Sequence, residues 1–262
     1  MGRVPTNLRI AIGCDEVGGG DAVPIVFLHG VGSDKSVWRP QLAHFGAERR
    51  TVAFDYPGYG DSDPAPEGTA RDDYAAAILS AMTELGIGQT HICGLSLGGV
   101  VAIAMHAAAP ERCASLILAD TFVVHPDGQA IYDRSLATTD LRAMAEARVD
   151  VLLARPADPA VRGQVVETMA RIDPAAYRIG AQAVWLADQR ERAQEIRVPT
   201  LVLCGSEDKV TPPALSRELA QLIPGAHFEL IESAGHLSNL ERPETFNTQV
   251  GAFVRGADSR AS

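Results

Sequence analysis

The sequence predicts an α/β protein built on a mostly parallel β-sheet with helices on both faces. Short continuous apolar runs, such as residues 24–28 and 115–120, are typical of strands buried on both faces of a parallel sheet. Segments with helical periodicity alternate with these runs, as right-handed crossover connections require. Glycine-rich or polar loops follow the runs, at the sheet edge where such folds bind ligands.

The length, composition and charge of the chain limit the classes of function that it can have. The chain has 262 residues, 46% of them apolar, which fits one large domain or a domain with an insertion. A net charge of −10 argues against nucleic acid or an anionic membrane as partner. We find no membrane-spanning run, signal-peptide core, zinc-ligand spacing, phosphate loop or dinucleotide motif. We therefore expect a cytoplasmic protein with a small-molecule substrate and neither cofactor nor metal, of unassigned oligomeric state.

The first part of the chain predicts strands ending in loops. Residues 7–17 predict an opening antiparallel pair, and residues 51–54 a further buried strand. The strand at 24–28 ends in His-Gly-Val-Gly, where Gly30 lets the backbone approach a ligand closely. Asp72 or Asp73 is expected to cap a helix that runs to about Leu85.

Residues 94–99, Gly-Leu-Ser-Leu-Gly-Gly, carry the strongest signal. They read Gly-x-Ser-x-Gly between an apolar strand and a small-residue helix, which is the context of a nucleophile elbow. In so sharp a turn, neighbours with a Cβ would collide, hence the glycines. The turn lifts the Ser96 hydroxyl above the sheet edge and aims the Leu97 amide at the atom that Ser96 attacks.

Residues 121–196 contain no segment with the pattern of a strand, and their sequence predicts several helices. One is expected near 131–151, and others after Pro159 and Pro174, with Asp158 and Asp173 as caps. The segment predicts a helical cap over the carboxyl edge of the sheet, inserted in a core of residues 1–120 and 197–262. It holds nine Arg and no Lys. One arginine is a candidate to face a substrate carboxylate, although for any single arginine a solvated salt bridge is the commoner role.

The sheet resumes at residues 199–204, which end in Gly-Ser-Glu-Asp. A helix over 214–222 and a last strand over 227–231 follow, and His236 comes soon after that strand. Residues 241–255 predict a closing helix, with a frayed polar tail from Gly256.

Ser96, Asp208 and His236 each follow a predicted strand of one sheet, in the order Ser, Asp, His. A serine hydroxyl needs a base near pKa 7, and a histidine needs a carboxylate to hold its tautomer. We expect His236 to activate Ser96 and Asp208 to orient His236. The amides of Val31 and Leu97 are candidates to hold the oxyanion.

Alternatives for the acid remain open. Glu207 or Asp120 can replace Asp208, and Asp120 is the main rival because it also follows a strand. The other histidines lack a matching context and are interpreted as structural.

Together these motifs resemble the α/β-hydrolase family over nearly the whole chain. The resemblance rests on five segments: residues 29–30, 55–62, 94–99, 205–208 and 235–236. It implies a sheet of about eight strands, a helical cap inserted after the sixth, and a Ser-His-Asp triad.

Within the family, residues 235–241 resemble the histidine loop of 3-oxoadipate enol-lactonases, and residues 199–213 and 177–188 are also similar to theirs. The resemblance makes Trp185 a candidate to line the pocket, and Gly30 of the glycine loop is the second candidate for substrate binding. The chain departs from those enzymes at residues 29–32, where they have a more polar loop, and at Tyr56-Pro57, where an Arg is usual.

The functional hypothesis is a cofactor-free serine hydrolase that cleaves a carboxylic ester or lactone through an acyl-enzyme. One rival is a carbon–carbon bond hydrolase of a ring-cleavage product, which Leu95 and Leu237 disfavour because that subfamily usually has Asn and Trp there. Leu97 disfavours perhydrolases, which usually have Met. A slow-turnover receptor-like binding protein is the rival from another class.

Overall fold

Eight strands form one sheet in the computed structural model, which describes residues 2–261. Their spatial order is β1-β2-β4-β3-β5-β6-β7-β8. The strands span Gly2–Pro5 (β1), Ala11–Val17 (β2), Ile25–Leu28 (β3), Thr51–Phe54 (β4), Thr90–Leu95 (β5), Cys113–Ala119 (β6), Thr200–Gly205 (β7) and His227–Ile231 (β8). β2 runs antiparallel to both neighbours, and β3 to β8 are mutually parallel. The predicted fold class and strand number are confirmed.

The register of the parallel strands brings their carboxyl ends to one edge. Leu28 lies beside Gly94, Leu95 beside Ala119, and Gly205 beside Ile231. The loops that follow β3, β5, β6, β7 and β8 therefore all leave from the same side of the sheet. All four residues of β3 are buried, which is why this strand reads as a continuous apolar run.

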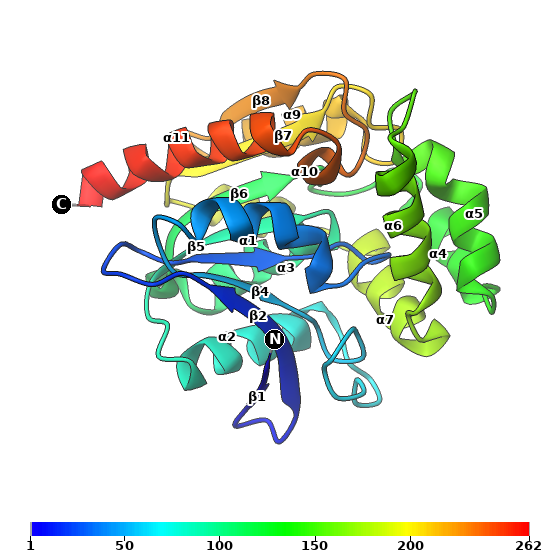
Figure 1. Ribbon diagram of the computed structural model, residues 1–262, viewed down its shortest axis with the longest axis horizontal. Coiled ribbons are helices and arrows are strands. Elements are labelled where there is room, and N and C mark those ends of the chain that lie inside the picture. The colour runs from blue at the N-terminus through cyan, green and yellow to red at the C-terminus, as the bar shows by residue number, and fades with distance from the viewer. Residues whose placement is uncertain (1, 262) are drawn as a thin grey trace.

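Helices cover both faces of the sheet. α1 (Arg39–Phe45) and α11 (Pro243–Ala261) pack together on one face. α2 (Arg71–Glu84), α3 (Leu97–Ala108) and α9 (Pro213–Leu222) lie on the other (Figure 1). α3 is buried from Leu97 to His106, so it is apolar nearly all round.

Five helices lie between β6 and β7. They are α4 (Gly128–Leu136), α5 (Leu141–Leu152), α6 (Pro159–Ala170), α7 (Pro174–Trp185) and α8 (Arg190–Glu195). Figure 1 shows α4 to α7, in green, gathered at one end of the sheet, whereas α8 packs beside α3 and α9. Asp158 and Asp173 accept amide hydrogen bonds at the starts of α6 and α7, as the sequence predicts.

The prediction of a single helix near 131–151 is wrong. The chain breaks it into α4 and α5, because Asp140 leaves the helical conformation and its carboxylate accepts a hydrogen bond from the Ala143 amide at 3.0 Å. Asp is a preferred residue at a helix start.

Three further boundaries differ from expectation. The opening strand pair begins at Gly2 rather than Asn7. α2 begins at Arg71, and Asp73 acts from inside its first turn, where its carboxylate accepts the Ala70 amide at 2.8 Å. The tail from Gly256 is not frayed, because α11 continues to Ala261.

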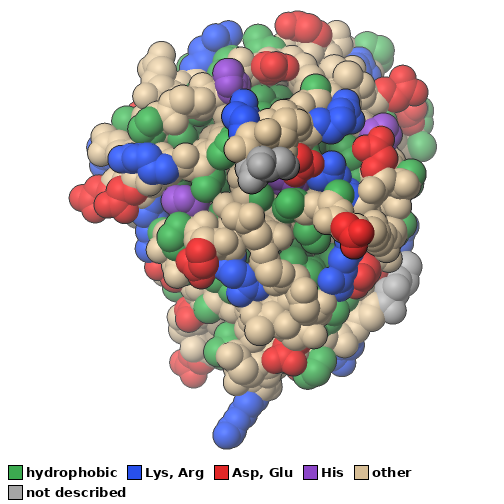
Figure 2. Space-filling view, turned by 90° about the vertical axis from the view of Figure 1, so that its left-hand side faces the viewer, with side chains coloured by type: hydrophobic (Ala, Val, Ile, Leu, Met, Phe, Trp, Pro, Cys, Tyr) green, Lys and Arg blue, Asp and Glu red, His purple; other side chains and the backbone are tan. Residues whose placement is uncertain are grey.

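The outer surface shows no large field of one sign on the face drawn in Figure 2, where acidic and basic side chains are interspersed. Within residues 2–261, no helix has both the length and the apolar character that crossing a bilayer demands.

Candidate active site

Ser96 sits at a strained turn between β5 and α3. Its backbone has φ 55° and ψ −114°, outside the regions that most residues adopt. A Cβ on Gly94 would lie 2.2 Å from the carbonyl oxygen of Gly98, and a Cβ on Gly98 would lie 2.1 Å from that of Leu28. The turn therefore closes only with glycine at both positions.

Two backbone amides beside Ser96 are left unpaired. Within residues 2–261, neither the Val31 nor the Leu97 amide has a hydrogen-bond acceptor. Leu97 is the first residue of α3, whose amino end carries partial positive charge. The loop after β3 lies close by, since a Cβ on Gly30 would be 3.4 Å from the Ser96 Cβ.

His236 and Asp208 form a buried pair. The His236 Nδ1 lies 2.8 Å from Asp208 Oδ2, and the two residues are 5% and 4% exposed. Asp208 Oδ1 also accepts the amides of Val210 and Thr211 at 2.7 and 3.0 Å. Burial alone would raise the pKa of Asp208, but the His236 charge and these hydrogen bonds hold it below its ordinary value.

The pairing with Asp208 also shifts the pKa of His236, in this case upward. Burial is the largest single influence and lowers its pKa, but the Asp208 charge, the hydrogen bond and the nearby Asp120 together raise the pKa above its ordinary value. With Nδ1 assigned as the donor to Asp208, Nε2 is the ring nitrogen left for chemistry.

Ser96 and His236 line one pocket. The Ser96 hydroxyl makes no hydrogen bond to any other residue in the described part of the chain, His236 included. Catalytic hydrogen bonds are commonly loose without substrate and tighten when it binds.

Asp120, the main rival for the acid, lies in a different environment. It follows β6 at φ 47°, and its Oδ1 accepts the Gly205 amide at 2.8 Å while Oδ2 pairs with the Ser238 hydroxyl. Burial and the charge of Asp208 raise the pKa of Asp120 to about 8. The structure thus pairs His236 with Asp208 rather than Asp120, and Glu207 is exposed.

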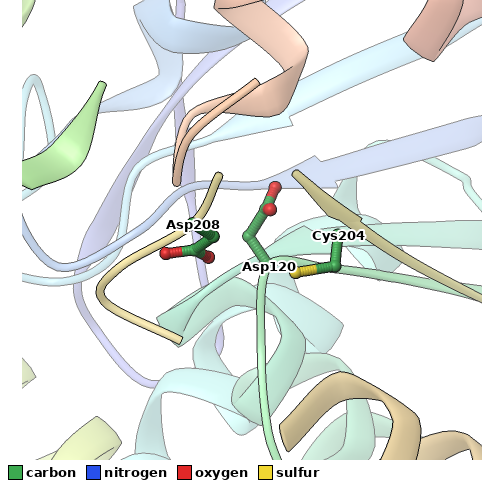
Figure 3. Close-up of side chains that lie close together, drawn as sticks. All are labelled: Asp120, Cys204 and Asp208. Atoms are coloured by element: carbon green, nitrogen blue, oxygen red, sulfur yellow. The ribbon is translucent and has the colours of Figure 1, made fainter. Parts of the chain in front are cut away.

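Asp120, Cys204 and Asp208 lie close together, with one ligand-type atom of each within 4.8 Å of the others (Figure 3). Metal binding requires a deprotonated thiol, but burial raises the pKa of Cys204 far above its ordinary value. The carboxylate oxygens already accept amide, hydroxyl and imidazole donors. Hydrogen bonding accounts for this cluster.

Sequence reasoning did not identify how the histidine loop is held. The His236 amide donates to the Leu152 carbonyl at 2.8 Å, which ties the loop to the end of α5. The Glu241 carboxylate accepts the amides of Gly235 and Ala154 at 2.8 and 2.7 Å. Glu241 belongs to the loop motif that resembles enol-lactonases. The motif therefore included this residue but did not predict the hydrogen bonds that it makes.

The pocket is completed by helices α5, α6 and α7. Trp185 and Gly30 both line it, and the Trp185 ring stacks on Phe122 with 5.8 Å between the ring centroids. Sequence reasoning missed seven further lining residues from these helices: Arg148, Leu152, Gln164, Val165, Thr168, Met169 and Tyr177. Single-sequence patterns do not show which helix face turns inward.

Comparisons with known proteins agree with this architecture. The family model described as "Alpha/beta hydrolase family" matches residues 25–249. The chain is 30% identical to 3-oxoadipate enol-lactonase 1 of Acinetobacter baylyi over 242 residues, 90% of each chain. The crystal structure of the enol-lactonase from Burkholderia xenovorans LB400 superposes with a TM-score of 0.90 and 30% identity, over 97% of this chain and 100% of that one.

Another relative is longer than this chain. The match to the dihydrolipoyllysine-residue acetyltransferase component of the acetoin cleaving system of Pseudomonas putida, at 30% identity, covers 92% of this chain but only 65% of that protein. The family model spans most of the sequence, and the fold and elbow geometry agree with it. The chain belongs to the alpha/beta hydrolase family.

Proposed function

We propose that this protein is a serine hydrolase that cleaves a carboxylic ester or lactone. One observation carries the proposal: Ser96, on its strained turn, and the buried His236–Asp208 pair line the same pocket. Nucleophile, base and orienting carboxylate are the parts that acyl transfer needs.

The chemistry runs in two steps. The Ser96 oxygen attacks the substrate carbonyl carbon while His236 Nε2 takes the hydroxyl proton, and Asp208 stabilises the imidazolium that forms. The amides of Val31 and Leu97 hold the oxyanion. The carbon–oxygen bond to the leaving group breaks as His236 returns the proton to that oxygen. Water, deprotonated by His236, then attacks the acyl carbon, and His236 passes this proton to the Ser96 oxygen as the bond between that oxygen and the acyl carbon breaks. The acid and free Ser96 are released.

We further propose that residues 121–196 act as a cap on a core of residues 1–120 and 197–262. The inward-facing residues of α5, α6 and α7 support this role, because they complete the pocket over the sheet edge. The four cysteines are free and buried, which supports the cytoplasm as compartment. The enol-lactonase names of two relatives support a lactone among the substrates to be tested.

A hydrolysis panel tests the proposal. It contains short and medium p-nitrophenyl esters, an enol-lactone, and a vinylogous diketone acid for carbon–carbon cleavage, each run with the parent chain and Ser96→Ala. We expect Ser96→Ala to lower kcat/KM by roughly 10⁴-fold or more, at an unchanged melting temperature. Ser233→Ala is the matched control, since Ser233 also has positive φ, 57°, but is exposed and outside the pocket.

The panel separates the rivals. Preference for the enol-lactone supports a lactonase, and preference for simple esters supports a general carboxylesterase. Turnover of the diketone acid alone favours a carbon–carbon hydrolase. A burst of one product equivalent with a persistent adduct favours a receptor-like protein. Parent-like ester hydrolysis by Ser96→Ala would overturn the mechanism.

A further inference from the structure

One residue gives the pocket its fixed charge. Of the described residues that line it, Arg148 on α5 is the only Arg, Lys, Asp or Glu. Most of the other lining residues are apolar, and His236 is the only other ionisable group besides the Tyr177 phenol. The chain as a whole carries a net charge of −10, so a positively charged pocket differs from the rest of the molecule.

Arg148 has no partner in the described part of the chain. It is half-buried, and no hydrogen bond or ion pair joins it to another residue of 2–261. Seven of the nine arginines in residues 121–196 do have such partners: Arg142, Arg155, Arg162, Arg171, Arg178, Arg190 and Arg192. The eighth, Arg134, is exposed. A partly buried charge without a counter-charge is unfavourable unless a ligand supplies one.

Two further donors in the pocket also lack acceptors. The Trp185 Nε1–H is buried and finds no partner in residues 2–261. The Tyr177 hydroxyl also makes no hydrogen bond within these residues, and the residue as a whole is 3% exposed. Burial raises the pKa of Tyr177, and the Arg148 charge lowers it. The Arg148 charge also lowers the pKa of His236. Arg148 therefore acts electrostatically on both sides of the pocket.

We propose that the substrate carries a carboxylate and that Arg148 binds it. The inference deepens the proposed function and rests on it: the substrate is a monoanionic ester or lactone whose hydrocarbon part packs on the apolar wall. A guanidinium suits a carboxylate because its donors form a planar fork. The Trp185 and Tyr177 donors lie in the same pocket to complete the carboxylate's hydrogen bonds.

The opposing interpretation is that Arg148 only reaches solvent. Arg148 and Tyr177 also border a second hollow, lined by residues of α4, α5 and α7 that include Arg134 and Met144. In that case Arg148 discriminates no substrate, and its removal changes the hydrolysis of charged and neutral substrates equally.

Matched substrate pairs distinguish the two. The first pair places the charge in the acyl part: 4-nitrophenyl hydrogen adipate against 4-nitrophenyl 6-methylheptanoate, in which an isopropyl group replaces the carboxylate. The second pair places it in the alcohol part: 4-acetoxybenzoate against 4-isopropylphenyl acetate. Each is assayed with the parent, Arg148→Met, Arg148→Lys and Arg142→Met. Arg142 is the control because it lies on the same helix, pairs with Glu167 and is outside the pocket.

We expect Arg148→Met to lower kcat/KM about 10- to 100-fold for the charged member of at least one pair. Its neutral partner should change less than about threefold. Arg148→Lys should recover part of the loss, since it keeps the charge but not the fork. Arg142→Met should resemble the parent. Equal effects of Arg148→Met on both members of both pairs would overturn the inference while leaving the proposed function intact.

A binding measurement keeps the inference testable if no ester is turned over, which would be a failure of the proposed function alone. Tryptophan fluorescence reports binding of 4-oxopentanoate and of its neutral isostere 5-methylhexan-2-one to Ser96→Ala, because Trp185 lines the pocket whereas the second tryptophan, Trp38, is buried outside it. We expect the acid to bind more tightly, and the added Arg148→Met change to weaken only the acid, by about tenfold or more. Equal affinities, or no response to Arg148→Met, would contradict the carboxylate site.

Discussion

The floor and the roof of the pocket differ in how their polar groups are satisfied. The floor consists of the strand-edge loops that hold Ser96, Asp208 and His236, and here both oxygens of Asp208 and the His236 Nδ1 are hydrogen-bonded. The roof consists of α5, α6 and α7, and it leaves Arg148 and the Trp185 Nε1–H without partners in residues 2–261. In the floor, the hydrogen-bonded His236–Asp208 pair is fixed, while the groups placed to meet the substrate carbonyl, the Ser96 hydroxyl and the amides of Val31 and Leu97, lack partners within residues 2–261. The unpaired groups of the roof are free to select the substrate.

The two regions also get their precision from different sources. Strand register sets the floor, together with a turn so tight that a Cβ on Gly94 or Gly98 would lie 2.2 or 2.1 Å from a backbone oxygen. The geometry of the floor therefore depends on the backbone. The roof depends on helix packing and on caps such as Asp158 and Asp173. Two hydrogen bonds join the roof to the floor: the His236 amide donates to the Leu152 carbonyl, and the Ala154 amide donates to the Glu241 carboxylate.

After the loss of Ser96, the largest loss of activity should come from replacing Asp208, the carboxylate of the floor. Asp208→Asn should lower kcat for a neutral ester by about 10³- to 10⁴-fold, because an amide does not hold the required His236 tautomer or stabilise its charge. Asp120→Asn should cost less than about tenfold. The pKa of Asp120, raised to about 8, favours its neutral form at pH 7, and an amide keeps the acceptor for the Gly205 amide.

Steady-state kinetics at pH 7 compare kcat of Asp208→Asn and Asp120→Asn, and melting temperatures confirm that both variants are folded. The reverse order, with Asp120→Asn the more damaging variant, would move the orienting acid to the end of β6 and break the assignment of the floor.

The pH profile shows how strongly the roof acts on the floor. His236 must be neutral to accept the Ser96 proton, and its pKa is raised. The kcat/KM for a neutral ester should therefore fall as pH drops through a value above about 6.5, the ordinary histidine pKa. Arg148→Met should move this midpoint upward, because the Arg148 charge lowers the pKa of His236.

Arg142→Met serves as the control and should leave the midpoint in place. A midpoint that moves down in Arg148→Met, or moves equally in both variants, would show that the Arg148 charge does not reach His236.

The smallest effect should come from a change in the roof alone. Asp173 accepts the amides of Ala175 and Ala176 at 2.8 and 3.1 Å. Asp173→Ala should cost about 1 kcal/mol of stability and lower Tm by about 2–4 °C, with kcat/KM for a neutral ester within about twofold. Asp173→Asn, which keeps the cap, should match the parent. A large loss of activity at unchanged Tm would mean that the start of α7 takes part in the chemistry.

Much of the floor was predictable from the sequence. Ser96 lies in a motif whose glycines have a steric cause. Asp208 follows the continuous apolar run of β7, and His236 follows β8, whose polar and apolar residues alternate. Local chemistry was enough for these residues because strand period and turn residues are short-range signals. The starts of α6 and α7 were predictable for the same reason, from Asp-Pro pairs.

The roof was less predictable. The break between α4 and α5 depends on one cap at Asp140, within a stretch that otherwise reads as continuous helix. Among nine arginines, no sequence feature distinguished Arg148, because its difference is the absence of a partner in the folded chain. The role of Glu241 depends on a contact with Ala154, 87 residues away in sequence.

The most direct test of the central claim is covalent labelling with a fluorophosphonate, followed by peptide mapping. The mechanism predicts one label per chain, on Ser96, no label on Ser96→Ala, and much slower labelling of His236→Gln, whose side chain does not serve as the base. A label on a different residue, or an enzyme that hydrolyses esters at full rate after treatment while Ser96 stays unmodified, would contradict Ser96 as the nucleophile.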